Sequence, residues 1–292
     1  MDGVESSARK RARVGVDLTI LALVGIVLIA ALGAGGAVLY KDYYSPSAFV
    51  TRYLDLLSSG RAADALRVPG VAVDRETLDD AGLSPTASEA LLRHAALAPL
   101  TDVRIESEKA VDDGFAVTVG YSASGHPGKT TFTVTQDGWE GVAPRWRFDD
   151  SPLAVVDLTL RGADQFSVNG FAVDRRQVSA AGMDAAPLDP LPLLVFTPGL
   201  YAVTVDTAIS ESSGIGVLAD TPLATTPLDV QTTPTEEFLS VVQERVEEFL
   251  TGCTTQEVLQ PTACPFGLRV ENRIASPPKW SIAQQPEIMV AP

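Results

Sequence analysis

The feature that most constrains this chain is a run of 23 uncharged residues, Leu18 to Tyr40, made mainly of leucine, isoleucine, valine, alanine and glycine. As a helix rising about 1.5 Å per residue, the run would span roughly 34 Å, enough for a bilayer hydrocarbon core of about 30 Å. Four basic residues precede it, whereas Lys41 follows it alone. Because the more basic flank of a membrane helix stays in the cytoplasm, we expect a cytoplasmic tail over 1–17, a transmembrane helix over 18–40 and an extracytoplasmic remainder.

The same run fits a second interpretation, a cleaved secretory signal peptide. Gly35, Gly36 and Ala37 are small residues of the kind found at cleavage sites. The apolar part of a signal peptide is usually about 7–15 residues long, and this run is longer. The length therefore favours a single-pass membrane anchor.

The chain is strongly acidic, and this excludes one class of function. Its formal net charge is −15, its pI is near 4.5, and the acidic excess lies entirely after residue 40. Proteins that bind nucleic acid need basic surface to neutralise phosphates, so we expect no nucleic-acid partner. Two histidines and two cysteines leave few ligands for a metal site, so we expect neither metal nor cofactor.

Residues 45–152 begin with helical patterns. Ser45 and Pro46 are typical of a helix start, and apolar residues then recur at helical spacing until Gly60. Shorter helices are expected over 61–66 and from Ser84 to about Leu97.

The rest of this segment alternates between apolar and polar residues. After Pro99, turn pairs such as Asp113-Gly114 and Asp137-Gly138 separate the alternating runs. Helices followed by hairpin-linked strands predict an α+β domain in which an antiparallel sheet wraps the helices.

Residues 153–230 show only strand and turn patterns. Asn169-Gly170 is a strong hairpin turn signal, and residues 201–205 alternate clearly. We expect a small β-sandwich here.

Residues 235–292 open with an amphipathic helix capped by Thr235 and ended by Gly252. Two strands are expected after it, over 267–274 and 280–282. The apolar stripe of the helix consists of Phe238, Val241, Val242, Val246, Phe249 and Leu250.

An order of features occurs twice in the chain. The same features follow Leu54 and Phe249 in the same order: an apolar helix end, a glycine, a short polar helix, a leucine and a proline. A diverged repeat would look like this. Residues 235–292 would then be a partial second copy of the first α+β unit.

These patterns resemble a known family. Residues 45–150 resemble extracytoplasmic NTF2-like domains in Phe49-Val50-x-x-Tyr53-Leu54, in the segment 60–66 and in Trp146-Arg147-Phe148. Residues 155–230 resemble PEGA-like β-domains in Asn169-Gly170 and Pro198-Gly199-x-Tyr201. The tandem order is similar to TcaA-type membrane proteins, although no cysteine-based zinc ribbon precedes the apolar run. The resemblance implies a role in the cell envelope.

Cys253 and Cys264 are eleven residues apart, in a part of the chain expected to lie in an oxidising compartment. We expect a structural disulfide between them. The spacing differs from Cys-x-x-Cys, which disfavours a redox-active pair.

Catalytic motifs are missing from the sequence. His94 and His126 are the only imidazoles, and neither belongs to a metalloprotease, nucleophile-elbow or phosphate-loop motif. The paired acids at 79–80, 112–113 and 149–150 do not follow calcium-loop spacing, so we interpret them as solvated loops.

NTF2-like folds enclose a pocket between the sheet and the helices, and eight apolar or aromatic residues are candidates for its lining here. These eight side chains are also needed to fill the hydrophobic core, and we favour the core interpretation. The candidate pocket residues are Phe49, Tyr53, Leu57, Phe115, Val117, Tyr121, Phe132 and Trp146.

We therefore expect a membrane-anchored, non-enzymatic envelope protein that acts by binding a protein or a cell-wall component. Binding or sensing of a small ligand in the NTF2-like pocket is the alternative. An enzyme would require a histidine paired with a carboxylate in that pocket.

Overall fold

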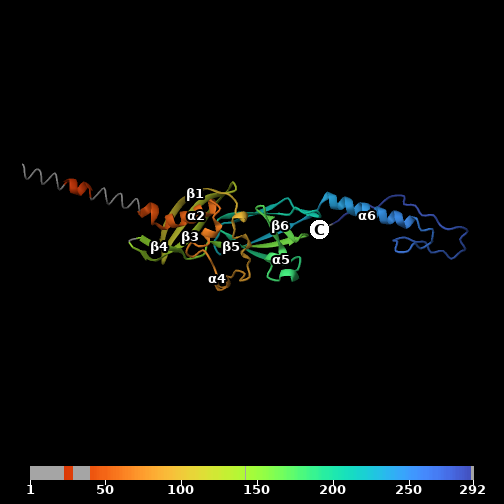
Figure 1. The fold of residues 1–292 in the computed structure, drawn as a ribbon, viewed down its shortest axis with the longest axis horizontal. Coiled ribbons are helices and arrows are strands. Elements are labelled where there is room, and N and C mark those ends of the chain that lie inside the picture. Colours follow the sequence, from red (N-terminus) through yellow and green to blue (C-terminus); the bar gives the residue numbers. More distant parts are fainter. Residues whose placement is uncertain (1–22, 29–39, 142, 291–292) are drawn as a thin grey trace, which may run out of the picture.

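A computed structural model describes residues 23–28, 40–141 and 143–290 of the chain. The predicted tail over 1–17 and most of the predicted membrane helix over 18–40 lie outside these residues. Within the described part of the chain, no helix is both long and apolar enough to cross a membrane. The described fold is α+β, as predicted (Figure 1).

The first part of the fold begins with helices. The N-cap serine is confirmed, because the Ser45 hydroxyl accepts a hydrogen bond from the backbone N–H of Ala48 at 3.1 Å. The helices are α2 (Pro46–Ser58), α3 (Ala62–Ala65) and α4 (Arg75–Asp80), followed by the 3₁₀ turns η1 (Glu89–Leu91) and η2 (His94–Ala96).

The continuous helix expected from Ser84 to Leu97 is wrong, since only η1 and η2 form there. The backbone of Ser88 is extended instead and bonds to a strand that lies a hundred residues later. Its N–H donates to Pro192 at 2.8 Å, and its carbonyl accepts from Leu194 at 2.9 Å. Pairing with this distant strand prevents Ser88 from continuing a helix.

Four antiparallel strands follow in the order β1-β2-β3-β4, and α2 packs on the face of this sheet. Asp137-Gly138 is not the predicted hairpin turn, because β3 runs on through it with a shift in register between Gln136 and Trp139. The strands are β1 (Leu100–Val111), β2 (Gly114–Ala123), β3 (His126–Glu140) and β4 (Ala143–Phe148).

Two further sheets face each other across a second core and form a β-sandwich. One has the order β12-β5-β8, with β12 parallel to β5, and the other has the order β11-β9-β6-β7. Their strands are β5 (Leu153–Arg161), β6 (Gln165–Val168), β7 (Phe171–Asp174), β8 (Leu191–Phe196), β9 (Gly199–Thr204), β11 (Ile215–Ala219) and β12 (Thr225–Gln231). The connection between β7 and β8 contains α5 (Arg175–Val178) and η3 (Gly182–Asp184), and the short strands β10 (Ser210–Glu211) and β13 (Thr233–Pro234) pair with each other in a separate two-stranded sheet.

The turn predicted at Asn169-Gly170 is confirmed. Both residues have positive φ, 50° and 85°, which the tight hairpin between β6 and β7 requires. The Asn169 amide also donates to Ala96 and to Leu200, each at 2.8 Å, so this turn ties η2 to the sandwich.

Strands β5 and β8 belong to both cores. Leu153 and Val155 of β5 pack with α2 and the first sheet, whereas Val156 and Leu158 face the second sheet of the sandwich. Because alternate residues of a strand point to opposite faces, one strand seals two cores at once.

The chain ends in α6 (Glu236–Thr254) and an irregular tail. The strands expected over 267–274 and 280–282 are wrong, and so is the end expected at Gly252, because α6 continues to Thr254. The short polar helix expected after that glycine is also wrong. The tail instead makes single bonds to the chain just after α6: Leu268 N–H to the Leu259 carbonyl at 2.7 Å, and the Trp280 indole to Val258 at 2.8 Å. Isolated bonds of this kind do not build a strand ladder.

Candidate functional site

The eight candidate pocket residues come together in the first core. Seven are buried, and Phe115 is half-buried against them. The rings of Tyr53 and Phe132 are 6.1 Å apart, and those of Phe115 and Trp146 are 5.5 Å apart and nearly perpendicular. These contacts are those of a packed aromatic core.

Tyr53 is the polar group at the centre of this core. Its hydroxyl donates to the carbonyl of Thr197 at 2.9 Å and lies 3.2 Å from the carbonyl of Pro152. Burial raises the pKa of Tyr53 well above its ordinary value, so the phenol is a neutral hydrogen-bond donor. It satisfies backbone carbonyls at the junction between the two cores.

Two clefts lie outside this core, on either side of α2. One, of about 690 Å³, separates α2 from β1 and carries charges of both signs, including Arg52 and Glu106. The other, of about 510 Å³, lies between α2 and β4 and is lined by Phe49 and Trp146 from the candidate pocket, with Arg145 beside them. Both volumes are in the usual range for small-ligand sites, roughly 300–1,000 Å³.

The two histidines lie in different places. The His94 imidazole packs against Gly60, whose added Cβ would come within 2.2 Å of Nδ1, and His126 opens strand β3. Within the described residues, no group of three or more acidic, histidine or cysteine side chains is arranged to hold a metal ion.

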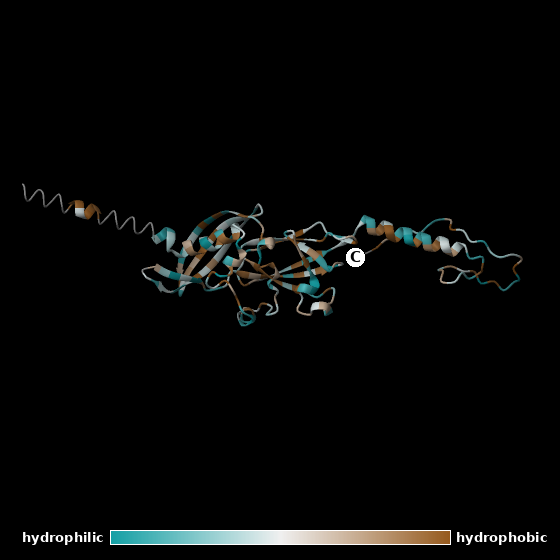
Figure 2. Cartoon of the chain, viewed as in Figure 1, coloured by the Kyte–Doolittle hydropathy of each residue, from teal (hydrophilic) through white to brown (hydrophobic). Residues whose placement is uncertain are grey.

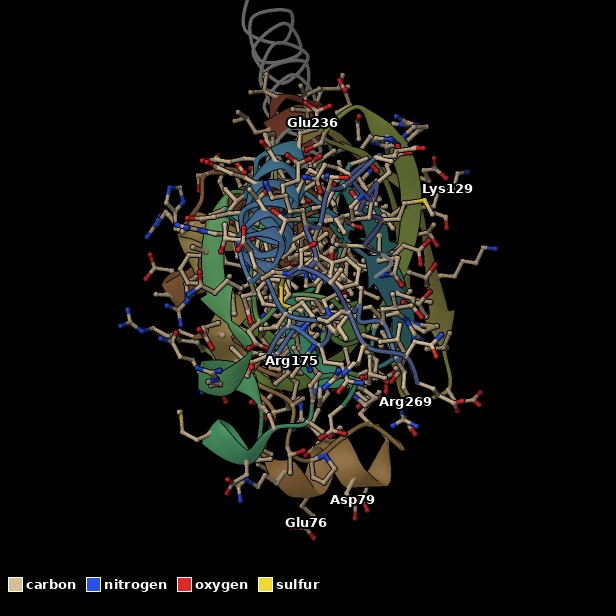
Figure 3. The ribbon with its side chains drawn as sticks, turned by 90° about the vertical axis from the view of Figure 1, so that its right-hand side faces the viewer. Glu76, Asp79, Lys129, Arg175, Glu236 and Arg269 are labelled. Atoms are coloured by element: carbon tan, nitrogen blue, oxygen red, sulfur yellow. A yellow bond between two sulfur atoms is a disulfide. The ribbon has the colours of Figure 1, made fainter. Side chains whose placement is uncertain are left out.

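The paired acids are exposed. They lie in α4, in the turn between β1 and β2, and just after β4. Glu76 and Asp79 of α4 point away from the body (Figure 3). Exposed carboxylates of this kind are solvated, as the sequence indicated.

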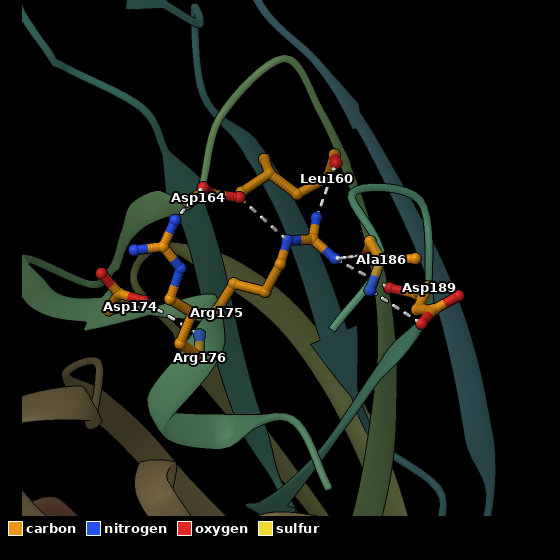
Figure 4. A network of polar contacts seen from close by, with 7 residues as sticks. All are labelled: Leu160, Asp164, Asp174, Arg175, Arg176, Ala186 and Asp189. Carbon is orange, nitrogen blue, oxygen red and sulfur yellow. Dashed lines mark hydrogen bonds and ion pairs between the residues drawn. The ribbon is translucent and has the colours of Figure 1, made fainter. Parts of the chain in front are cut away.

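Arg175 is a charged residue that the sequence analysis missed. Its side chain is 1% exposed, and its guanidinium donates to the carbonyls of Leu160, Ala186 and Asp189 at 2.8, 3.2 and 3.0 Å (Figure 4). Its Nε lies 3.5 Å from Asp164. These bonds hold the loop between α5 and β8 against β5. Sequence patterns mark arginine as a surface residue, so nothing along the chain pointed to this role.

The disulfide predicted between Cys253 and Cys264 is confirmed, with Cα atoms 5.8 Å apart. It joins the last turn of α6 to the start of the tail. The rings of Phe266 and Trp280 lie 5.0 Å apart in the same tail. The disulfide and this small cluster fold the tail back on the end of the helix.

The apolar face of α6 is the feature that best fits a binding site. The sequence predicted the stripe, and Figure 2 shows hydrophobic residues in brown along α6. The structure leaves part of this stripe in contact with solvent. Val241 is 49% exposed and Phe249 is 51% exposed. The described hydrogen bonds that join α6 to the sandwich are at its N-cap, where the Thr235 hydroxyl donates to Ala208 at 2.8 Å.

Comparison with protein-family models, with curated proteins and with solved structures finds no match to this chain in any of the three. The resemblance to NTF2-like and PEGA-like domains therefore stays a prediction from sequence patterns.

Proposed function

We propose that the chain is a membrane-anchored, extracytoplasmic protein of the cell envelope that acts without catalysis, by binding a protein or a cell-wall component. The observation that carries this proposal is the exposed apolar face of α6. Exposed apolar surface is costly in water and marks sites of interaction. In Figure 1, α6 projects from the sandwich at the end opposite α2, where the residues following the predicted anchor enter the body.

The disulfide supports the proposed compartment. Disulfides form and persist outside the cytoplasm and are uncommon inside it. Cys253 and Cys264 are well placed to be bonded. The predicted anchor over 18–40 and this disulfide both favour an extracytoplasmic body.

The body itself is suited to act as a spacer. Strands β5 and β8 are shared by two cores, and Thr130 donates to the carbonyl of Asp220 at 2.7 Å across the same junction. A junction with shared strands resists bending more than a flexible linker does. The protein would then hold α6 at a set distance from the membrane.

Reporter fusions test this proposal. Alkaline phosphatase, which folds only in an oxidising compartment, and a fluorescent protein that matures only in the cytoplasm would each be fused after residue 292. We expect active phosphatase, a dark fluorescent fusion and both products in the carbonate-washed membrane fraction. A variant that lacks residues 1–40 is the control and should lose export. Fluorescence of the full-length fusion, or release by carbonate, would contradict the proposal.

The two clefts beside α2 favour a second candidate function, binding of a small ligand. The cleft between α2 and β4 combines an apolar wall with Arg52, Arg145 and Glu140, which suits a ligand that has an apolar part and a polar group able to pair with a guanidinium. A thermal-shift screen of wall fragments, lipids and metabolites tests it, because a ligand that binds the folded state raises the melting temperature. Loss of the shift in Trp146→Ala would place the ligand in this cleft.

A further inference from the structure

The sequence of α2 and the residues that follow it can be aligned with the sequence of α6 and the residues that follow that helix. Pro69 comes nine positions after Gly60, and Pro261 comes nine positions after Gly252. Both helices have a hydroxyl N-cap, Ser45 in α2 and Thr235 in α6. With the two glycines matched, α2 lies opposite residues 238–250 of α6 without a gap. Gly60 follows the end of α2, whereas Gly252 lies inside α6, and Ser45 falls opposite Glu237, two residues after Thr235.

This alignment pairs the buried face of α2 with the apolar face of α6. On α2, these residues pack against the inner face of the β1–β4 sheet. The pairs are Phe49 with Val241, Val50 with Val242, Tyr53 with Arg245, Leu54 with Val246, and Leu57 with Phe249.

The paired positions differ sharply in exposure. Phe49 and Leu57 are 6% and 4% exposed, whereas Val241 and Phe249 are 49% and 51% exposed. The returning tail covers one flank of α6, where the Gln243 amide donates to Pro286 at 2.8 Å and accepts from Ile288 at 2.9 Å. The side of this face that carries Val241 and Phe249 stays open, whereas Val242 and Val246 are half-buried.

The charged residues of α6 restrict which kind of surface can pack against its open face. Five glutamates and one arginine, Arg245, lie on α6, and three of the glutamates, Glu237, Glu244 and Glu248, border the open face on one side. Arg245 pairs with Glu248 at 2.8 Å, so Glu237 and Glu244 carry the uncompensated charge along that border. A matching surface therefore needs cations along that side. An anionic membrane surface is repelled by the same glutamates.

A second copy of this chain fits poorly for two reasons. Its β1–β4 sheet is already covered by its own α2. Its α6 carries the same five glutamates, so two helices face to face would repel.

We infer that the open face of α6 binds the apolar face of an antiparallel β-sheet on a partner protein, with lysine or arginine along one border. α6 would take on that sheet the place that α2 takes on β1–β4. Arg245 stands where Tyr53 donates to backbone carbonyls; one of its guanidinium nitrogens already pairs with Glu248 at 2.8 Å, and the remaining N–H groups can donate to carbonyls or carboxylates of the partner. This inference rests on the proposed function and adds the chemistry of the partner.

The first experiment tests the fit within the chain itself. The variant Phe49→Val/Leu54→Val/Leu57→Phe gives α2 the apolar residues of α6 and keeps Tyr53. We expect one cooperative unfolding transition and native-like near-ultraviolet circular dichroism. Phe49→Glu/Leu57→Glu is the control, in which that transition should be lost. If the first variant behaves like the control, the face of α6 does not suit a β-sheet, and the inference is overturned.

The second experiment identifies what touches α6 in cells. The photo-crosslinker p-benzoylphenylalanine would replace Val241 or Phe249 in the full chain, with Glu244 on the acidic side of the helix as the control position. We expect both apolar positions to crosslink one protein at alternate residues of its strands, at least tenfold more than Glu244 does. Adducts should also fall when salt is raised, because screening weakens the charged border.

Other adducts would overturn the inference. These are adducts to a second copy, to lipid or to a partner helix, equal adducts from Glu244, and no adduct at either apolar position. An adduct to a second copy or to lipid leaves the reporter fusions active and so overturns only the partner assignment. Inactive phosphatase fusions would refute the proposed function itself.

Discussion

The hydroxyl of Tyr53, in the first helix of the body, donates a hydrogen bond of 2.9 Å to the backbone carbonyl of Thr197, 144 residues further along the chain. Both residues are fully buried. This bond joins α2 to the end of β8 at the place where the helix-on-sheet core meets the sandwich. A tyrosine that was a candidate for a ligand pocket thus stabilises the junction between two cores.

Removing this hydroxyl tests its contribution. We expect Tyr53→Phe to lower the free energy of unfolding by about 1–3 kcal/mol, because the Thr197 carbonyl is left buried without its donor. Urea denaturation of the purified chain measures this difference. Tyr43→Phe is the control, because Tyr43 is 62% exposed and its substitution should change the free energy of unfolding little. An unchanged free energy of unfolding in Tyr53→Phe would mean that a water molecule replaces the phenol as the donor to Thr197.

The buried tyrosines also predict loss of stability at high pH. Burial raises the pKa of both Tyr53 and Tyr201 in the folded state above the ordinary value of 10.0. The folded state therefore keeps these protons above pH 10 while the unfolded state loses them, so stability is full below pH 10 and falls as pH rises. The two groups together predict a slope of about 2.7 kcal/mol per pH unit above pH 10. Denaturation of Tyr53→Phe between pH 10 and 11.5 should show roughly half this slope, and an identical slope in the variant would contradict the assignment.

Arg175 should contribute strongly to the stability of the sandwich. Arg175→Ala leaves three backbone carbonyls, those of Leu160, Ala186 and Asp189, without their donor. We expect a loss of about 3–5 kcal/mol, the range for breaking a buried charged network. Thermal unfolding followed by circular dichroism measures it. The neighbouring Arg176→Ala is the matched control, because that side chain is 49% exposed and its loss should cost under about 1 kcal/mol.

The disulfide should stabilise only the C-terminal segment. Closing a loop of about twelve residues contributes roughly 3 kcal/mol by chain entropy. Because α6 is joined to the sandwich mainly at its N-cap, we expect Cys253→Ser/Cys264→Ser to leave the main unfolding transition unchanged. Limited proteolysis with mass mapping should show several-fold faster cleavage over 255–265. A shift of the main transition by more than a few degrees would mean that the tail is coupled to the body.

Much of the local structure followed from the sequence. Ser45 and Pro46 start α2, Thr235 starts α6, and Asn169-Gly170 turns the β6–β7 hairpin, because each depends on bonds within a few residues. The disulfide was predictable for a related reason: its two cysteines are the only ones in the chain and lie close in sequence.

Other features depended on partners far away in the chain. The helix expected after Ser84 failed because Ser88 bonds to Pro192 and Leu194, and no pattern near Ser88 announces that contact. The strands expected in the tail failed because an alternating pattern forms a strand only where a neighbouring strand supplies hydrogen bonds.

The sequence by itself determined the helical and alternating periods, the caps, the acidic charge and the apolar stripes, since these are properties of neighbouring residues. Only the tertiary structure decided which stripes are covered. Both α2 and α6 carry an apolar stripe, yet Leu57 is buried under a sheet and Phe249 is exposed. Burial depends on what packs against a face, and that contact is made by residues far from it in the chain.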